Sequence, residues 1–130
     1  MEGRDFDYYE ARARDVKLED ITSCKDNAEI LRRLRDQDTS LDDISIADDA
    51  DDDYFVVGEG DDIGWLGYFI GKSICLTYFY INSWGEGENI EALIEGINHN
   101  QSITRLHIDT NLGGLCFRNL RPFFRNNNNL

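Results

Sequence analysis

The sequence predicts a short α/β solenoid, in which about three strand–helix units stack behind an acidic N-terminal lead. Three observations predict this fold. Apolar positions return every 27 residues, every unit combines strand spacing with helix spacing, and the excess negative charge is confined to the first half of the chain. The strands would form a parallel sheet on the concave side, and the helices would form the convex side.

The 27-residue period appears in six apolar columns. They are Ile63/Ile90/Phe117, Leu66/Leu93/Leu120, Ile70/Ile97/Phe124, Leu76/Ile103/Leu130, Phe79/Leu106 and Ile81/Ile108. One polar position also repeats, since Asn100 returns as Asn127, and we expect it in the turn from helix to strand. A single unit cannot bury its apolar face alone, so the columns indicate stacked units that share one core.

Each unit shows two spacings. Phe79 and Ile81 are two residues apart, which places them on one face of a strand. Leu93 and Ile97 are four residues apart, which places them on one face of a helix. A looser copy lies upstream, with a helix over residues 28–34 and the strand pattern over residues 41–46.

The spacing of the strand patterns divides the chain into segments. The strand patterns begin at Leu41, Leu76 and Ile103, so the first step is 35 residues long and the second is 27. The eight extra residues of the first step fall in an acidic loop near residues 47–62. We therefore expect a partly disordered lead over residues 1–26 and the solenoid over residues 27–130. Leu130 would begin a further strand, which predicts a truncated end. A helix over residues 117–125 and an open strand edge at residues 103–108 would then favour self-association.

The strand pattern resembles a known family. Ile103-x-x-Leu106-x-Ile108-x-x-Asn111 resembles the leucine-rich-repeat consensus L-x-x-L-x-L-x-x-N. The repeat length and the helix are similar to the ribonuclease-inhibitor-like subclass, and residues 66–73 and 122–130 are similar to repeats in expanded families of unicellular algae. The resemblance covers residues 27–130. Trp84 and Asp49 depart from it, because each stands where the consensus has asparagine.

The side chains between the apolar columns would point out of the concave sheet. They stack as Asp42/Thr77/Thr104, Asp43/Tyr78/Arg105, Ser45/Tyr80/His107 and Ala47/Asn82/Asp109. Tyrosines offer large, rigid contact areas with a polar tip. We therefore predict a non-catalytic protein-binding module that uses Tyr78, Tyr80, Asn82, Arg105, His107 and Asp109. The alternative is that these are ordinary exposed strand residues with high β propensity.

The charge distribution limits the class of partner. Residues 1–62 hold 21 Asp and Glu against 8 Lys and Arg, whereas residues 63–130 hold five of each. A negative field repels phosphate backbones, so nucleic acid is not expected as a partner. A basic protein would be attracted to the same field.

Residues 63–81 invite a second interpretation, because Lys72 is their only charge and their length would permit a membrane span. The central position of Lys72, the glycines at 64, 67 and 71, and the match to the repeat all argue against it. A membrane-associated fragment stays as an alternative function, as does an incomplete repeat copy without an independent role.

The chain start lacks a basic region followed by an apolar one, so no secretory signal is evident. Cys24, Cys75 and Cys116 form no close pair, which favours free thiols and a cytoplasmic protein.

Catalytic and metal chemistry have little support in the sequence. Ser102, His107 and Asp109 could be drawn as a triad, but nothing supplies an oxyanion hole. The aspartates between residues 48 and 53 lack the ligand order and the glycine of an EF-hand. We therefore expect no enzyme activity, no cofactor and no metal.

Overall fold

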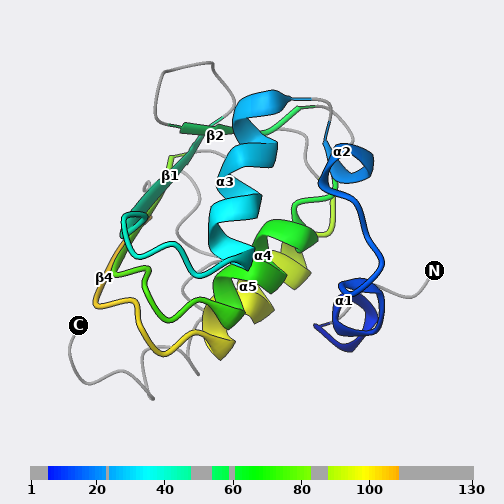
Figure 1. The fold of residues 1–130 in the computed structure, drawn as a ribbon. Coiled ribbons are helices and arrows are strands. Elements are labelled where there is room, and N and C mark those ends of the chain that lie inside the picture. The colour runs from blue at the N-terminus through cyan, green and yellow to red at the C-terminus, as the bar shows by residue number, and fades with distance from the viewer. Residues whose placement is uncertain (1–5, 23, 48–53, 59–60, 83–87, 109–130) are drawn as a thin grey trace.

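The computed structural model of the chain describes residues 6–22, 24–47, 54–58, 61–82 and 88–108 (Figure 1). Helices and strands alternate along most of this length. In chain order the elements are α1 (Phe6–Arg12), α2 (Leu18–Ile21), α3 (Lys25–Arg35), β1 (Asp43–Ala47), β2 (Tyr54–Val56), α4 (Gly64–Lys72), β3 (Tyr78–Ile81), α5 (Ile90–His99) and β4 (Arg105–Ile108). Three of the strands, β1, β3 and β4, are each preceded by a helix.

The strands form one sheet in the order β2-β1-β3-β4, and all neighbours are parallel. The register places Ile44, Phe79 and Leu106 side by side, as the apolar columns predict. Phe79 and Ile81 are buried, whereas Tyr78 and Tyr80, which alternate with them along β3, are half-buried. This alternation follows from the two-residue period of a strand, and it confirms the predicted inner face of the sheet.

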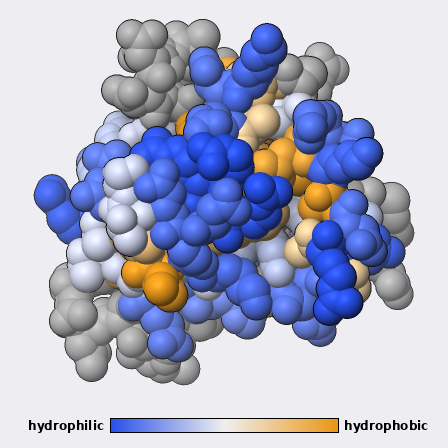
Figure 2. All heavy atoms as spheres, in the orientation of Figure 1, coloured by the Kyte–Doolittle hydropathy of each residue, from blue (hydrophilic) through white to orange (hydrophobic). Residues whose placement is uncertain are grey.

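The elements lie in three layers (Figure 1). The sheet lies on the left of the view. The second layer, beside it, consists of α3, α4 and α5, and the third, on the far side of those helices, consists of α1 and α2. The predicted parallel sheet with helices against one face is therefore confirmed. Figure 2, in the same orientation, shows hydrophilic side chains over α3 and a hydrophobic strip between α3 and the N-terminal helices.

Helix α4 is buried along all but its last two residues. Residues 64–70 are all buried, because α3 and α5 flank the helix and α1 packs on it. Residues 63–81, the candidate membrane segment of the sequence, are divided between α4, a turn and β3. Among the described parts of the chain there is no helix with both the length and the apolar character to cross a membrane.

Two glycines allow α4 and α5 to approach closely. A Cβ atom added at Gly96 would lie 1.9 Å from the carbonyl oxygen of Gly67, and one added at Gly67 would lie 2.5 Å from the Cα of Leu93. These contacts are with backbone atoms, which cannot turn away as a side chain can. The two helices therefore touch through their main chains at this point.

A side chain caps each turn from helix to strand. Asn100 is fully buried, and its Oδ1 accepts hydrogen bonds from the amides of Ser102 and Ile103, both at 2.7 Å. Ser73 and Asp38 occupy the same place, three residues before Leu76 and Leu41 respectively. The Ser73 Oγ accepts from the Leu76 amide at 3.1 Å, and the Asp38 Oδ1 accepts from the Ser40 amide at 2.9 Å. The predicted polar turn position is therefore a hydrogen-bonding cap.

The described part of the N-terminal segment, for which we expected a partly disordered lead over residues 1–26, is mostly helical. It forms α1 and α2, and Tyr9 is fully buried against α4 with its ring centroid 4.8 Å from that of Trp65. The Tyr9 hydroxyl donates to Asp62 at 2.7 Å. The repeat could not show this contact, because the aromatic side chains of α1 have no counterpart 27 residues away.

A hydrogen bond and an ion pair also join α1 to the exposed end of α4. Tyr68 donates its hydroxyl to Glu10, and the Lys72 ammonium lies 3.3 Å from the same carboxylate. The Tyr68 bond, followed by the nearby Lys72, lowers the pKa of Glu10. Burial and the Glu10 carboxylate raise the pKa of Tyr68. These contacts hold α1 across the helix layer.

The acidic segment over residues 47–62 also differs from the expected loop, because it contains β2. This strand lies at the edge of the sheet, and a helix side chain pairs with both backbone groups of its last residue, Val56. The buried Asn27 of α3 donates to the Val56 carbonyl at 2.6 Å and accepts from the Val56 amide at 2.9 Å. Asn27 thus takes the place of a further strand at this edge.

Several sequence predictions lie outside the described residues. They are the helix over 117–125, the truncated end at Leu130, the consensus positions Asp49, Trp84 and Asn111, the Asn127 turn, and the thiol of Cys116.

Candidate functional site

The candidate site is the outer face of the sheet, the face that points away from α4 and α5. Two rows of side chains cross it. The first row is Asp43, Tyr78 and Arg105, and the second is Ser45, Tyr80 and His107. The structure therefore brings together four of the six predicted binding residues, from β3 and β4, in the columns that the sequence indicates.

Each tyrosine of the outer face lies against a side chain from β4. The Arg105 guanidinium carbon is 5.0 Å from the centroid of the Tyr78 ring, within the range of a cation–π contact. Tyr80 stacks on His107 with ring centroids 4.4 Å apart and ring planes 15° apart. These contacts with neighbouring side chains restrict the rotamers open to the two tyrosines.

The remaining two predicted residues are less closely joined to this surface. Asn82 follows the last residue of β3, is exposed, and donates its backbone amide to the Ile46 carbonyl at 2.9 Å. It therefore extends the Tyr78–Tyr80 line along the sheet. Asp109 lies outside the described residues.

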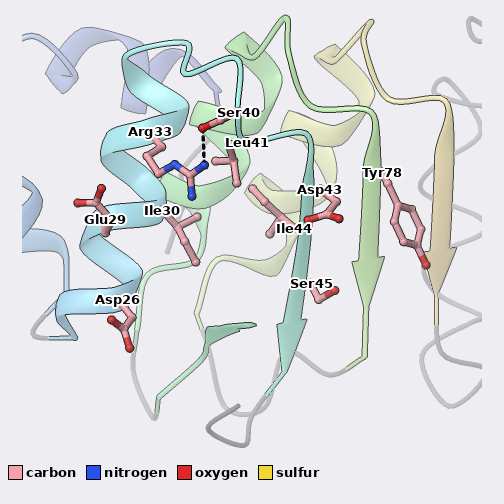
Figure 3. A pocket seen from close by; sticks show the side chains of 10 residues that line it. All are labelled: Asp26, Glu29, Ile30, Arg33, Ser40, Leu41, Asp43, Ile44, Ser45 and Tyr78. Atoms are coloured by element: carbon pink, nitrogen blue, oxygen red, sulfur yellow. Dashed lines mark hydrogen bonds between the residues drawn. The ribbon is translucent and has the colours of Figure 1, made fainter. Parts of the chain in front are cut away.

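Beside the outer face lies a groove between α3 and β1, which we call the α3–β1 groove (Figure 3). Its volume is about 400 Å³. Helix α3 contributes Asp26 and Ile30, β1 contributes Asp43 and Ile44, and Tyr78 of the outer face lines it from β3. Figure 3 shows α3 standing beside the edge of β1, so the groove opens on the same side as the outer face.

The cation in the groove wall is neutralised. Arg33 lies 3.0 Å from the Asp38 carboxylate and donates to the Ser40 hydroxyl at 2.8 Å. Asp38 also accepts the hydroxyl and the amide of Ser40. The Ser40 hydroxyl and amide, followed by Arg33, lower the pKa of Asp38 to about 2. Arg33 therefore adds little positive potential to the groove.

The sequence reasoning missed the groove. Asp26, Ile30 and Arg33 lie at spacings of four and three residues, which places them on one face of α3 and could have indicated a shared surface. The opposite wall comes from β1 and from Tyr78 of β3, and no local pattern in the sequence indicates that α3 lies beside these strands.

The side chains considered for catalysis have structural contacts. The Ser102 hydroxyl lies within hydrogen-bond distance of the Leu76 and Ser73 carbonyl oxygens. His107 stacks on Tyr80, and among the described residues no hydrogen bond joins it to Ser102. Within the described ranges, no three His, Cys, Asp or Glu side chains gather in a way that could hold a metal. Cys24 and Cys75 are half-buried and carry no disulfide.

Comparisons with family models, with curated proteins and with solved structures give no match for this chain.

Proposed function

We propose that the chain is a leucine-rich-repeat solenoid of about three strand–helix units, and that it is a non-catalytic module that binds a protein through the outer face of the sheet. The support for the fold is the 27-residue period together with the all-parallel sheet and its register. Stacked units of this kind present one continuous sheet surface to a partner.

The observation that supports binding best is the ordering of the two tyrosines. Tyr78 and Tyr80 are half-buried on the strand next to β4, and Arg105 and His107 hold their rings. Tyrosine and arginine are the residues that most often carry binding energy in protein interfaces. Their place on paired strands keeps the contact geometry rigid, as a specific interface requires.

Site-specific photo-crosslinking tests the location of the interface. A crosslinking group placed by Tyr80→p-benzoylphenylalanine should capture a protein partner from a cell extract. The same group placed by Glu91→p-benzoylphenylalanine reports on the exposed side of α5, away from the outer face. Capture at position 91 but not at position 80 would move the interface to the helices and refute the proposal.

A matched variant makes the captured partner interpretable. The wild-type chain, added without the crosslinking group, should compete with capture at position 80. The Tyr78→Ala variant should compete much less well, because it removes the neighbouring ring and leaves the strand pairing intact. Equal competition by the two proteins would show that the captured partner does not use the outer face.

A further inference from the structure

We propose that the α3–β1 groove receives an extended segment of the protein partner and holds a lysine or arginine side chain from it. This inference rests on the proposed function, because the groove opens beside the outer face and shares Tyr78 with it. It adds the chemistry of the partner, which the outer face by itself leaves open.

The shape of the groove fits a side chain and its backbone. A volume of about 400 Å³ lies within the range of small-ligand sites, roughly 300–1,000 Å³. The half-buried Ile30 gives it aliphatic surface, and Tyr78 adds one aromatic side chain. The methylene stem of a lysine or arginine packs on such surfaces while its charged end reaches a polar group.

Among the described residues, the start of β1 is paired on one side only. Its pairing with β2 begins at Ser45, which lies opposite Tyr54. Asp43, two residues earlier, pairs with Tyr78 of β3 and has no strand on its other side among the described residues. An unpaired strand edge can add an extended peptide through main-chain hydrogen bonds.

The charges in the groove select a basic segment. Asp26 lies on the α3 side of the groove and Asp43 on the β1 side (Figure 3), and neither has a hydrogen-bond or ion-pair partner among the described residues. Arg33 is neutralised by Asp38, and Glu29 is paired with Arg32. A hydrogen bond between an ammonium or guanidinium group and a carboxylate is stronger than a neutral one. The two free carboxylates therefore favour a cationic side chain.

Titration with a short peptide tests the inference on the full chain. The probe is acetyl-Thr-Val-Lys-Val-Thr-amide, followed by amide NMR shifts of the ¹⁵N-labelled protein, and its matched control carries norleucine in place of lysine. We expect the lysine peptide to shift the amides of Ile30, Asp43 and Ser45 and to bind at least about tenfold more tightly than the control. Equal binding by both peptides, or shifts spread evenly over the acidic half, would overturn the inference.

Charge-matched variants separate the groove from the general field. Asp26→Asn with Asp43→Asn should weaken the lysine peptide at least about tenfold, whereas Glu19→Gln with Asp20→Asn on α2 should leave it within twofold. If both double variants weaken binding of the lysine peptide equally, the effect is due to net charge and the groove inference is wrong. The same NMR spectra show whether each variant is folded, and Asp43→Asn alone is the second variant if the double one is not.

A variant at Tyr80 distinguishes a failure of the proposed function from a failure of the groove inference. Tyr80 does not line the groove, so Tyr80→Ala should leave binding of the lysine peptide unchanged while weakening the protein partner. If the partner needs Tyr80 but the lysine peptide does not bind, the groove inference is wrong and the outer face stands. If the peptide binds in the groove and Tyr80→Ala leaves the affinity of the partner unchanged, the proposal that the partner binds the outer face is wrong.

Discussion

Single side chains carry out main-chain pairing at several places in this molecule. Asn27 pairs with both backbone groups of Val56, and Gln37 accepts from the Ile74 amide while donating to the Lys72 carbonyl. Asp38, Ser73 and Asn100 cap the three helix-to-strand turns. A buried backbone group without a partner costs about 1–3 kcal/mol, so side chains such as the buried Asn100 add to the stability that the apolar core provides.

The Asp38 cap predicts a pH dependence. Because its pKa falls from 3.8 to about 2 in the folded chain, the carboxylate stabilises the fold above pH 3.8 or so. This contribution is lost as the pH falls from about 4 to about 2. Ser40→Ala removes the hydroxyl donor, so the pKa of Asp38 should rise toward 3.8 in a carboxyl ¹³C NMR titration. An unchanged pKa in Ser40→Ala would contradict the cap.

The edge strand gives a second prediction. Asn27→Leu keeps the side-chain size but leaves the amide and carbonyl of Val56 without the partner that the buried Asn27 supplies, so it should lower the free energy of unfolding by about 2 kcal/mol. Hydrogen exchange at the Val56 amide should become much faster. Gln37→Leu is the control, because it removes two hydrogen bonds of the same kind at a more exposed place. Slow exchange at Val56 in Asn27→Leu would show that β2 does not depend on this side chain.

At the level of elements, the periodic parts could be predicted and the unique parts could not. α4, β3, α5 and β4 follow from the apolar columns, because burial on one face forces a period on the sequence. α1 and β2 occur once, so no column reveals them. The repeat indicates the cap at Asn100, but it does not reveal the other two, since Asp38 and Ser73 perform the same task with different side chains.

The contact between α4 and α5 gives a prediction at this scale. Gly96→Ala would place a methyl group against the backbone of Gly67, and the helices would have to separate. We expect a loss of about 1–3 kcal/mol in chemical denaturation, after the gain that alanine brings to a helix. Gly58→Ala is the control, because its nearest neighbour is the movable Asp61 side chain at 3.1 Å. Equal stability of the two variants would contradict the close approach.

At the scale of the whole molecule, the two sides of the helix layer differ. The sheet side exposes ordered polar and aromatic side chains, whereas α1 covers the apolar α4 on the other side. The positions of the outer-face residues could be predicted, because a strand period fixes which side chains share a face. The α3–β1 groove could not, because it depends on where β2 begins to pair with β1.

The covering role of α1 can be measured directly. Tyr9→Ala removes a fully buried aromatic ring together with its hydrogen bond to Asp62. Truncations of this size cost about 3–5 kcal/mol, so the variant should melt well below the wild type. Tyr8→Ala on the same helix is the control, because Tyr8 is only half-buried. Similar melting temperatures for the two variants would show that α1 does not stabilise the helix layer.

The affinity of the crosslinked partner, measured by titration calorimetry, tests the central claim most directly. Tyr78→Ala with Tyr80→Ala removes both rings from the outer face, and the buried Phe79 and Ile81 keep β3 in the sheet. We predict a loss of about 2 kcal/mol or more, a roughly 30-fold weaker Kd, with an unchanged melting temperature. An unchanged Kd in this folded variant would contradict the account, because the partner would then bind without the two side chains that define the site.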